Sequence, residues 1–344
     1  MSDERAAGDE RDEPMSGRQG TRGVDRLRGA WRAVTAGDVD LSVRVGSLEL
    51  PNPVMTASGT ADHADELQAY FPMGRLGAVV GKSLSVDPWP GNPAPRVHQT
   101  AAGMLNSVGL QGPGIEAWIS EDLPRLVGTG ARIVLSIWGQ RVEDFAKAAA
   151  ALSGVDGLTA GEVNVSCPNI EDRRRMFAHS PTATAEVVAA VGEGCPDLPR
   201  WAKLSPTVAD LAEVAGAALS AGAEAVTLIN TVLAMAIDVE SRRPVLGSGP
   251  LGGGLSGPAV HPVAVRAVFD VRAAHPDATI IGVGGVMTGV DAIELVLAGA
   301  DAVQVGTAIF RDPRAPIKIL DQMEAWCSRR GVRRLHDLCG AAHG

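Results

Sequence analysis

Eight short β-rich runs recur along this chain, and amphipathic helical stretches separate several of them. The runs cover residues 53–57, 78–82, 133–137, 162–165, 201–204, 225–229, 279–283 and 302–306. The clearest helical patterns cover residues 142–152, 183–191, 208–221, 262–274 and 290–298. Strands that read as apolar runs and alternate with helices indicate a parallel sheet covered on both faces. Eight such units predict an α/β fold of the (β/α)₈ TIM-barrel class.

An open, doubly wound sheet is the structural alternative to a barrel. Such a sheet would carry a glycine-rich fingerprint after its first strand, and Ala57-Ser58-Gly59-Thr60 does not match it. Two stretches, residues 83–114 and 231–259, exceed ordinary loop length, and both follow strand ends. Because this end of a barrel carries the active site, we expect two long loops that cover the substrate.

The first 40 residues differ in composition from the rest of the chain. They are rich in Arg, Asp, Glu and Gly and poor in apolar residues, so burial cannot offset the entropy of ordering them. The sequence therefore predicts a disordered, charged tail over residues 1–40, with at most a short helix at 24–31. A single barrel domain is predicted over residues 41–344.

Composition argues against several functions. The formal net charge of -9 argues against nucleic-acid binding, and no apolar run approaches the length of about 20 residues that a membrane span needs. The four cysteines show no metal-ligand spacing, and the charged N-terminal segment does not read as a secretory signal. We therefore expect a cytoplasmic protein with reduced thiols, no bound metal and no membrane contact.

One thiol stands apart from the other three. Cys167 follows an apolar run within Asn164-Val165-Ser166-Cys167-Pro168-Asn169, where proline stops the strand and two asparagines flank the sulfur. A buried cysteine that acts as a small apolar side chain is the ordinary interpretation. A proton-transfer group in a site built on strand ends is the alternative interpretation, and the rest of the chain favours it.

Polar side chains gather where the predicted strands end. Two of them, Lys82 and Lys203, lie in or just after apolar runs, and lysine is seldom buried without a partner. Two lysines at the same end of one barrel indicate an anionic ligand. The remaining polar residues at strand ends are Ser58, Ser83, Asn164, Cys167, Asn230 and Thr231.

Glycines after the last two predicted strands indicate a phosphate site. Gly284-Gly285 follows the seventh run and Gly306-Thr307 follows the eighth, where barrels commonly bind phosphate through backbone N–H groups. Gly257 could add a further amide. A phosphate site beside two lysines suggests a phosphorylated cofactor such as FMN.

Residues 47 to about 313 resemble the class 1 dihydroorotate dehydrogenases, which are FMN-containing (β/α)₈ barrels of pyrimidine (UMP) biosynthesis. The segments that carry the resemblance follow in chain order. They are Asn52-Pro53, Ala57-Ser58-Gly59, Gly81-Lys82-Ser83, Gly91-Asn92-Pro93, Gly103-Met104-Leu105-Asn106, Ser166-Cys167-Pro168-Asn169, Lys203-Leu204-Ser205-Pro206, Ile229-Asn230-Thr231, Gly253-Gly254-Leu255-Ser256-Gly257-Pro258, Gly284-Gly285 and Gly306-Thr307.

The resemblance implies the oxidation of dihydroorotate to orotate, with a proton lost from C5 to Cys167 as base and a hydride passed from C6 to FMN. It implies that Lys203 lies near N1 and O2 of the flavin, where a positive charge stabilises the reduced ring. The implied substrate residues are Lys82, Asn106, Gly109, Leu110, Asn164, Asn230 and Thr231. The implied flavin residues are Ala57, Ser58, Lys82, Ser83, Ser136, Asn164, Lys203, Ile229, Gly257, Gly284, Gly285, Gly306 and Thr307.

Details of the glycine segments look most like the NAD-linked branch of this family. That branch implies a partner subunit carrying FAD and an iron–sulfur cluster, and the family implies a homodimer. Two departures from its pattern are the charged stretch at residues 171–177 and Ser136, where the family has an asparagine.

Two other functions are alternatives. One is a dihydropyrimidine dehydrogenase-like flavin reductase acting on uracil or thymine, which also uses a cysteine base. Lys82 and the Met104-Leu105-Asn106 segment favour a substrate carboxylate instead. The other is a flavin-binding subunit with no catalysis of its own, suggested by the altered residues 171–177 and the tail.

Overall fold

The computed structural model of the chain describes residues 38–166 and 176–344. The tail expected over residues 1–40, apart from its last three residues, and the short helix expected at 24–31 lie outside the described residues. Cys167 and most of the altered stretch at 171–177 lie outside them as well.

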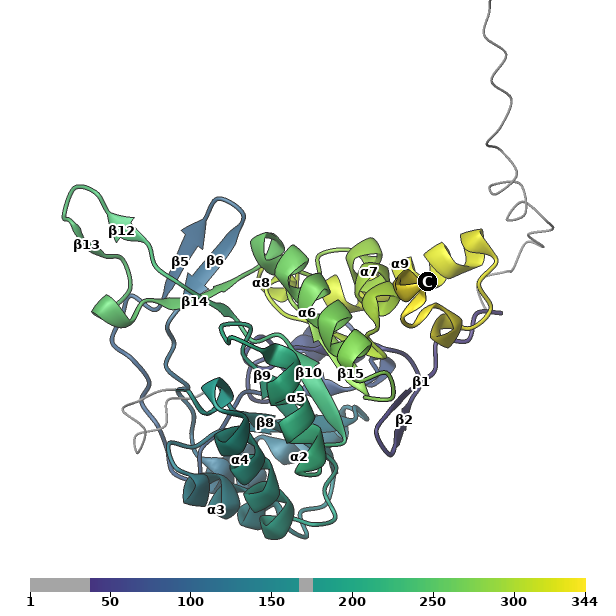
Figure 1. Cartoon of the computed structure of the whole chain (residues 1–344). Helices are drawn as coiled ribbons and strands as arrows, with labels where there is room; N and C mark the ends of the chain where they lie inside the picture. The colour runs from purple at the N-terminus through teal and green to yellow at the C-terminus, as the bar shows by residue number, and fades with distance from the viewer. Residues whose placement is uncertain (1–37, 167–175) are drawn as a thin grey trace, which may run out of the picture. The chain divides into compact units, whose positions relative to one another are not determined.

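Eight parallel strands form the centre of the fold (Figure 1). Around the sheet their order is β3, β16, β15, β10, β9, β8, β7 and β4, and a parallel bridge between Met55 and Ala78 joins the two outer strands. This closure confirms the predicted (β/α)₈ class and excludes the open sheet. The strands are β3 (Val54–Thr56), β4 (Val79–Val80), β7 (Ile133–Ile137), β8 (Leu158–Asn164), β9 (Arg200–Leu204), β10 (Ala225–Leu228), β15 (Ile280–Val283) and β16 (Ala302–Val305).

Helices cover the outside of the barrel, and the five predicted helical stretches correspond to α3, α4, α5, α6 and α7. Side chains fix where several of them begin, because an N-cap oxygen satisfies an otherwise open backbone N–H. The Asp210 carboxylate accepts a hydrogen bond from the N–H of Glu213 at 2.9 Å at the start of α5. The helices are α1 (Ile115–Glu121), α2 (Leu123–Gly128), α3 (Val142–Leu152), α4 (Pro181–Gly194), α5 (Leu211–Ser220), α6 (His261–Ala274), α7 (Gly289–Ala298), α8 (Ala308–Arg311) and α9 (Ala315–Arg330).

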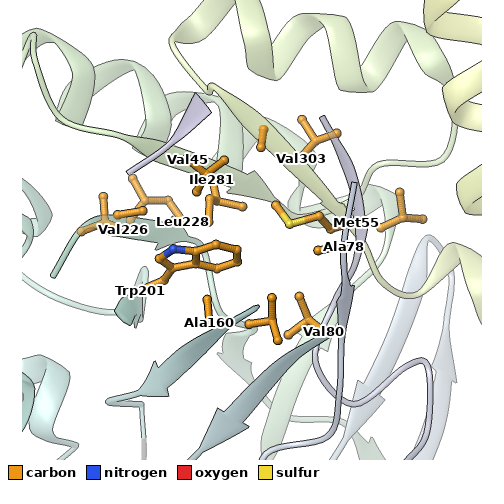
Figure 2. Packing of buried hydrophobic residues seen from close by; sticks show 14 of the residues in the cluster. Val45, Met55, Ala78, Val80, Ala160, Trp201, Val226, Leu228, Ile281 and Val303 are labelled. Carbon is orange, nitrogen blue, oxygen red and sulfur yellow. The ribbon is translucent and has the colours of Figure 1, made fainter. Parts of the chain in front are cut away.

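The barrel interior is filled by side chains rather than left open. Successive residues of a strand point to opposite faces, so every second residue of a barrel strand points inward. Figure 2 shows the indole of Trp201 extending toward the barrel axis among Met55, Val80 and Ala160. Trp201 and Met55 are fully buried, and together these residues form an apolar plug.

The two long segments expected as loops contain strands that pair with each other, which corrects that expectation. β5 (Val97–Thr100) and β6 (Gly103–Asn106) come from the first segment, and β11 (Val232–Ala234) and β14 (Gly253–Ser256) from the second. They form one antiparallel sheet in the order β11, β14, β6, β5. Figure 1 labels three of these strands, β5, β6 and β14. The second segment also holds the hairpin of β12 (Ile237–Asp238) and β13 (Arg243–Pro244).

A hairpin of β1 (Val43–Val45) and β2 (Leu48–Leu50) precedes the first barrel strand. Val45 is fully buried and belongs to the same apolar cluster as the barrel interior. Ser47 in its turn donates two hydrogen bonds to the carboxylate of Glu224, the residue before β10. Among the described residues, no helix combines the length and the apolar character needed to cross a membrane.

Candidate active site

A cavity of about 440 Å³ opens where the barrel strands end. Residues that follow seven of the eight strands line it, together with β6 and β14 of the antiparallel sheet. A second hollow of about 590 Å³ lies beside Asp62, Trp89 and Asp122 and contains none of the predicted site residues. The chemistry expected from the sequence is therefore gathered in the 440 Å³ cavity.

The predicted ligand residues come together on the wall of this cavity, with two exceptions. Ser136 does not line it, because its side chain points into the barrel below, and Cys167 lies outside the described residues. The residues on the wall are Ala57, Ser58, Lys82, Ser83, Asn106, Gly109, Leu110, Asn164, Lys203, Ile229, Asn230, Thr231, Gly257, Gly284, Gly285, Gly306 and Thr307.

A chain of amides and hydroxyls crosses the cavity wall. The side-chain amide of Asn230 donates to Oδ1 of Asn164 at 3.1 Å, and that of Asn164 donates to Oγ of Ser83 at 3.3 Å. The hydroxyl of Ser83 lies 3.1 Å from that of Ser58 and 2.8 Å from that of Ser136. These bonds fix the amide orientations, so that a polar ring meets donors and acceptors at set positions. Within the described part of the chain, Ser136 is thus joined to the cavity wall through Ser83.

The two lysines on the wall have different surroundings. Lys203 is 5% exposed, and its ammonium lies 3.3 Å from the carboxylate of Glu162. The ammonium of Lys82 has neither a hydrogen bond nor an ion pair with the described residues. Burial lowers the pKa of Lys82, the charge of Asp62 opposes this effect, and the charge of Lys203 adds to it. Lys82 is therefore the cation on the wall that is available to an anionic ligand.

The glycines after β15 and β16 leave room and donors for an anion. Gly257 and Gly285 have φ of +91° and +67°, and a Cβ on Gly285 would lie 2.8 Å from the carbonyl oxygen of Gly257. Among the described residues, the backbone N–H groups of Gly257, Gly285 and Gly306 have no hydrogen-bond acceptor. Close-set open N–H groups of this kind suit a phosphate.

Two hydroxyls on the same wall are also open. Oγ of Ser107 and Oγ of Ser166 are buried and have no hydrogen-bond partner in the described part of the chain. Buried polar atoms in native proteins are nearly always paired, so open ones on a cavity wall indicate a polar ligand. We call Gly257, Gly285 and Gly306 the glycine cradle. This cradle, the open hydroxyls and the cavity volume together fit a phosphorylated cofactor such as FMN.

Two residues that hold Lys203 were missed from the sequence. Glu162 and Gln304 are fully buried below the cavity wall, and both contact the ammonium of Lys203. The signal that could have found them is a charged or polar residue inside an apolar barrel strand, at an inward position. Glu162 lies two residues before Asn164, so both side chains point the same way.

A closed barrel with such a cavity at the ends of its strands places the chain among the barrel enzymes that act on small polar substrates. The sequence profile described as Dihydroorotate dehydrogenase matches residues 40–326. The chain therefore belongs to the dihydroorotate dehydrogenase family, flavin-dependent oxidoreductases that act on CH–CH groups. The family predicted from the sequence is thus confirmed.

Individual relatives agree with this assignment. A protein of Desulforudis audaxviator named dihydroorotate dehydrogenase B (NAD(+)), catalytic subunit, is 47% identical over 305 residues, covering 89% of this chain and 98% of that protein. Proteins of the same name from Geotalea uraniireducens and Pelobacter propionicus are 44% and 45% identical. They are matched over 99% and 98% of their lengths and over 89% and 88% of this chain.

Proposed function

We propose that this chain oxidises dihydroorotate to orotate on a bound FMN, in the synthesis of pyrimidines. The observation that carries the proposal is Lys82, a partly buried ammonium on the cavity wall without a partner among the described residues. A substrate carboxylate would supply the missing charge. The amides of Asn106, Asn164 and Asn230 line the same cavity, and their donors and acceptors suit the ring amides of a dihydropyrimidine.

FMN would be held at two places on the wall. The N–H groups of Gly257, Gly285 and Gly306 and the hydroxyl of Thr307 would bind its phosphate. Lys203 would lie against the ring, with Ser58 and Ser83 alongside. When bound, the flavin supplies the acceptor for the two electrons that leave C6 of the substrate.

The remaining chemistry belongs to residues of the chain. Oxidation forms the C5=C6 double bond, so C5 must lose a proton to a base. We assign this role to Cys167, because Ser166 before it lines the cavity and a thiol has a pKa within reach of neutrality. The hydrogen bond from the N–H of Ser166 to Oδ1 of Asn164, 3.2 Å long, ties the start of this segment to the substrate amides.

We further propose that electrons leave through a second subunit. The relatives are named as NAD(+)-linked catalytic subunits, and this chain has four cysteines without cluster spacing and no nucleotide fingerprint. An FAD and iron–sulfur subunit would connect the flavin to NAD. The protein reduced by dihydroorotate should therefore stay bleached when NAD(+) is added to this chain alone, and rapid reoxidation would refute the need for a partner.

The decisive experiment is anaerobic addition of dihydroorotate to the FMN-loaded protein while the visible flavin absorbance is followed. We expect bleaching by dihydroorotate, and no bleaching by dihydrouracil, which lacks the carboxylate. Lys82→Met should lose the response, and Lys147→Met, which changes an exposed lysine on α3, should keep it. Bleaching by dihydrouracil, with none by dihydroorotate, would move the function to a dihydropyrimidine reductase.

A further inference from the structure

Below the cavity wall lies an ion pair that the proposed chemistry does not use directly. Glu162 and Lys203 are joined at 3.3 Å, and their side chains are 0% and 7% exposed. Among the ion pairs of residues 38–166 and 176–344, it alone has both side chains less than one tenth exposed. Burying two charges is costly, so a buried ion pair is weak evidence for a gain in stability.

Gln304 completes a ring of three side chains. Its Oε1 accepts from the ammonium of Lys203 at 3.3 Å, and its Nε2 donates to Oε2 of Glu162 at 2.7 Å. The other carboxylate oxygen of Glu162 accepts from Lys203. An ammonium has three N–H donors, so this ring uses two of them and leaves the third for the cavity. The ring thus fixes both the position of Lys203 and the direction of its open donor.

The ring also decides the charge of the cavity. Among the described residues that line the cavity, Lys82 and Lys203 are the charged ones, and no carboxylate is present. The charge of Lys203 is offset from below by Glu162, whereas Lys82 has no carboxylate in contact. The two lysines therefore contribute differently to the charge of the cavity. Lys82 is an uncompensated positive charge, and Lys203 is a hydrogen-bond donor within a neutral pair.

We propose that Glu162 and Gln304 are positioning residues that hold the Lys203 ammonium at the cavity wall and offset its charge. The ease of reducing the flavin is then set by the Glu162–Lys203 pair rather than by Lys203 alone. This inference rests on the proposed function, since it requires FMN in the cavity. A reduced flavin is richer in electrons, so an uncompensated lysine beside it would favour reduction, and the carboxylate limits this effect.

The test is the reduction potential of the bound FMN, measured by equilibration with redox dyes at one fixed pH near neutrality. Glu162→Gln keeps the shape and removes the charge, and should raise the ratio of reduced to oxidised flavin at a fixed potential about tenfold. For a two-electron couple this is about 30 mV. Lys203→Met should lower the ratio by a similar factor, because it leaves the carboxylate uncompensated. The double variant should return to within about threefold of the parent protein.

Glu224→Gln is the matched control, since it removes a hydrogen-bonded carboxylate at the opposite end of β10 from the cavity. In Glu224→Gln, the ratio of reduced to oxidised flavin at a fixed potential should stay within about twofold of that in the parent protein. An unchanged potential in Glu162→Gln, or a double variant equal to Lys203→Met, would overturn the proposal. If Glu162→Gln does not fold, the comparison of Lys203→Met with the double variant still decides the question.

Two features separate this test from that of the proposed function. The dyes replace the substrate, so a protein that ignores dihydroorotate can still show the predicted potentials. Unfolding of the flavin-free proteins gives a second measurement, in which the double variant should be more stable than either single variant. Equal or lower stability of the double variant would show that the pair is not coupled, and would also overturn the proposal.

Discussion

Replacing Gly285 with alanine should weaken flavin binding, because the backbone there has no room for a Cβ. A Cβ would lie 2.6 Å from Cβ of His261 and 2.8 Å from the carbonyl oxygen of Gly257. These neighbours are held in place: Nδ1 of His261 is 2.9 Å from the carbonyl oxygen of Gly284, and its Nε2 is 3.2 Å from the carboxylate of Glu294. The added methyl group must therefore push the cradle apart.

Two costs follow from this geometry. Gly285 has φ of +67°, and alanine in that left-handed region costs about 1–2 kcal/mol. The contact with His261 and Gly257 adds an overpacking cost of about 1–3 kcal/mol. A substitution at Gly130 separates the backbone cost from the overpacking cost. Gly130 has φ of +71°, and a Cβ there would meet no atom within 4 Å. Gly130→Ala should therefore show the first cost alone.

The overpacking cost should appear in flavin affinity. In the flavin-free variant, we expect the loop that contains Gly285 to move and relieve the contact with His261 and Gly257. Flavin binding must then restore the original position of the loop. The overpacking cost therefore appears as a loss of affinity of about 5- to 150-fold. Titration of flavin-free protein with FMN, followed by quenching of flavin fluorescence, measures this loss, and urea unfolding measures stability. We expect Gly130→Ala to bind FMN as the parent does. If Gly285→Ala also binds within about twofold of the parent, the cradle is not where the phosphate binds.

The other predictions concern charge and thiols. Lys82→Met should weaken orotate binding by about 2–5 kcal/mol in a calorimetric titration, whereas Lys147→Met should bind orotate as the parent does. An equal loss in both variants would argue against a contact between Lys82 and the carboxylate of orotate. Because burial lowers the pKa of Lys82, the unfolded chain holds this proton more tightly, so the flavin-free protein should gain stability as pH rises toward the ordinary lysine pKa. Lys82→Met should flatten that rise in urea unfolding at several pH values, and an unchanged slope would contradict it. Iodoacetamide near neutral pH should modify Cys167 first in peptide mapping, and orotate should protect it, whereas faster labelling of another cysteine would argue against this base. The other thiols have raised pKa values because they are buried, to about 11 for Cys327 and about 12 for Cys339, and in direction also for Cys195.

The barrel could be predicted from the sequence because its signals are local. Each strand is a short apolar run, and parallel pairing places every carboxyl end on one face, so residues distant in sequence meet there without any knowledge of contacts. This is why Lys82, Asn164 and Asn230 were assigned to one site. The antiparallel sheet at the mouth escaped prediction because its pairing is non-local, with Leu105 of β6 opposite Leu255 of β14. These strands also contain glycine and polar residues in place of an apolar run, as in Val97–Thr100 and Gly253–Ser256, so they lack the signal that marks the barrel strands.

Contacts between side chains of the barrel interior also lay beyond the sequence. Gln304 and Glu162 are 142 positions apart and meet only because β16 and β8 face each other across a closed barrel. Ser136 illustrates the converse. The resemblance implies that it contacts flavin, which stays a prediction, and the structure places its hydroxyl 2.8 Å from that of Ser83, behind the residues that line the cavity.

The alternation of strand residues explains how the ring of Glu162, Lys203 and Gln304 is joined to the cavity wall. In β8 the inward positions run from Ala160 through Glu162 to Asn164, from the apolar plug to the cavity wall. Lys203 pairs in register with Asn164, and its ammonium reaches back to Glu162. Below this ring lie Trp201 and other apolar side chains, which give neither charge another partner. A single neutral substitution therefore leaves an isolated charge in an apolar layer, whereas removal of both charges does not. Removing both charges should therefore cost less stability than removing either one alone.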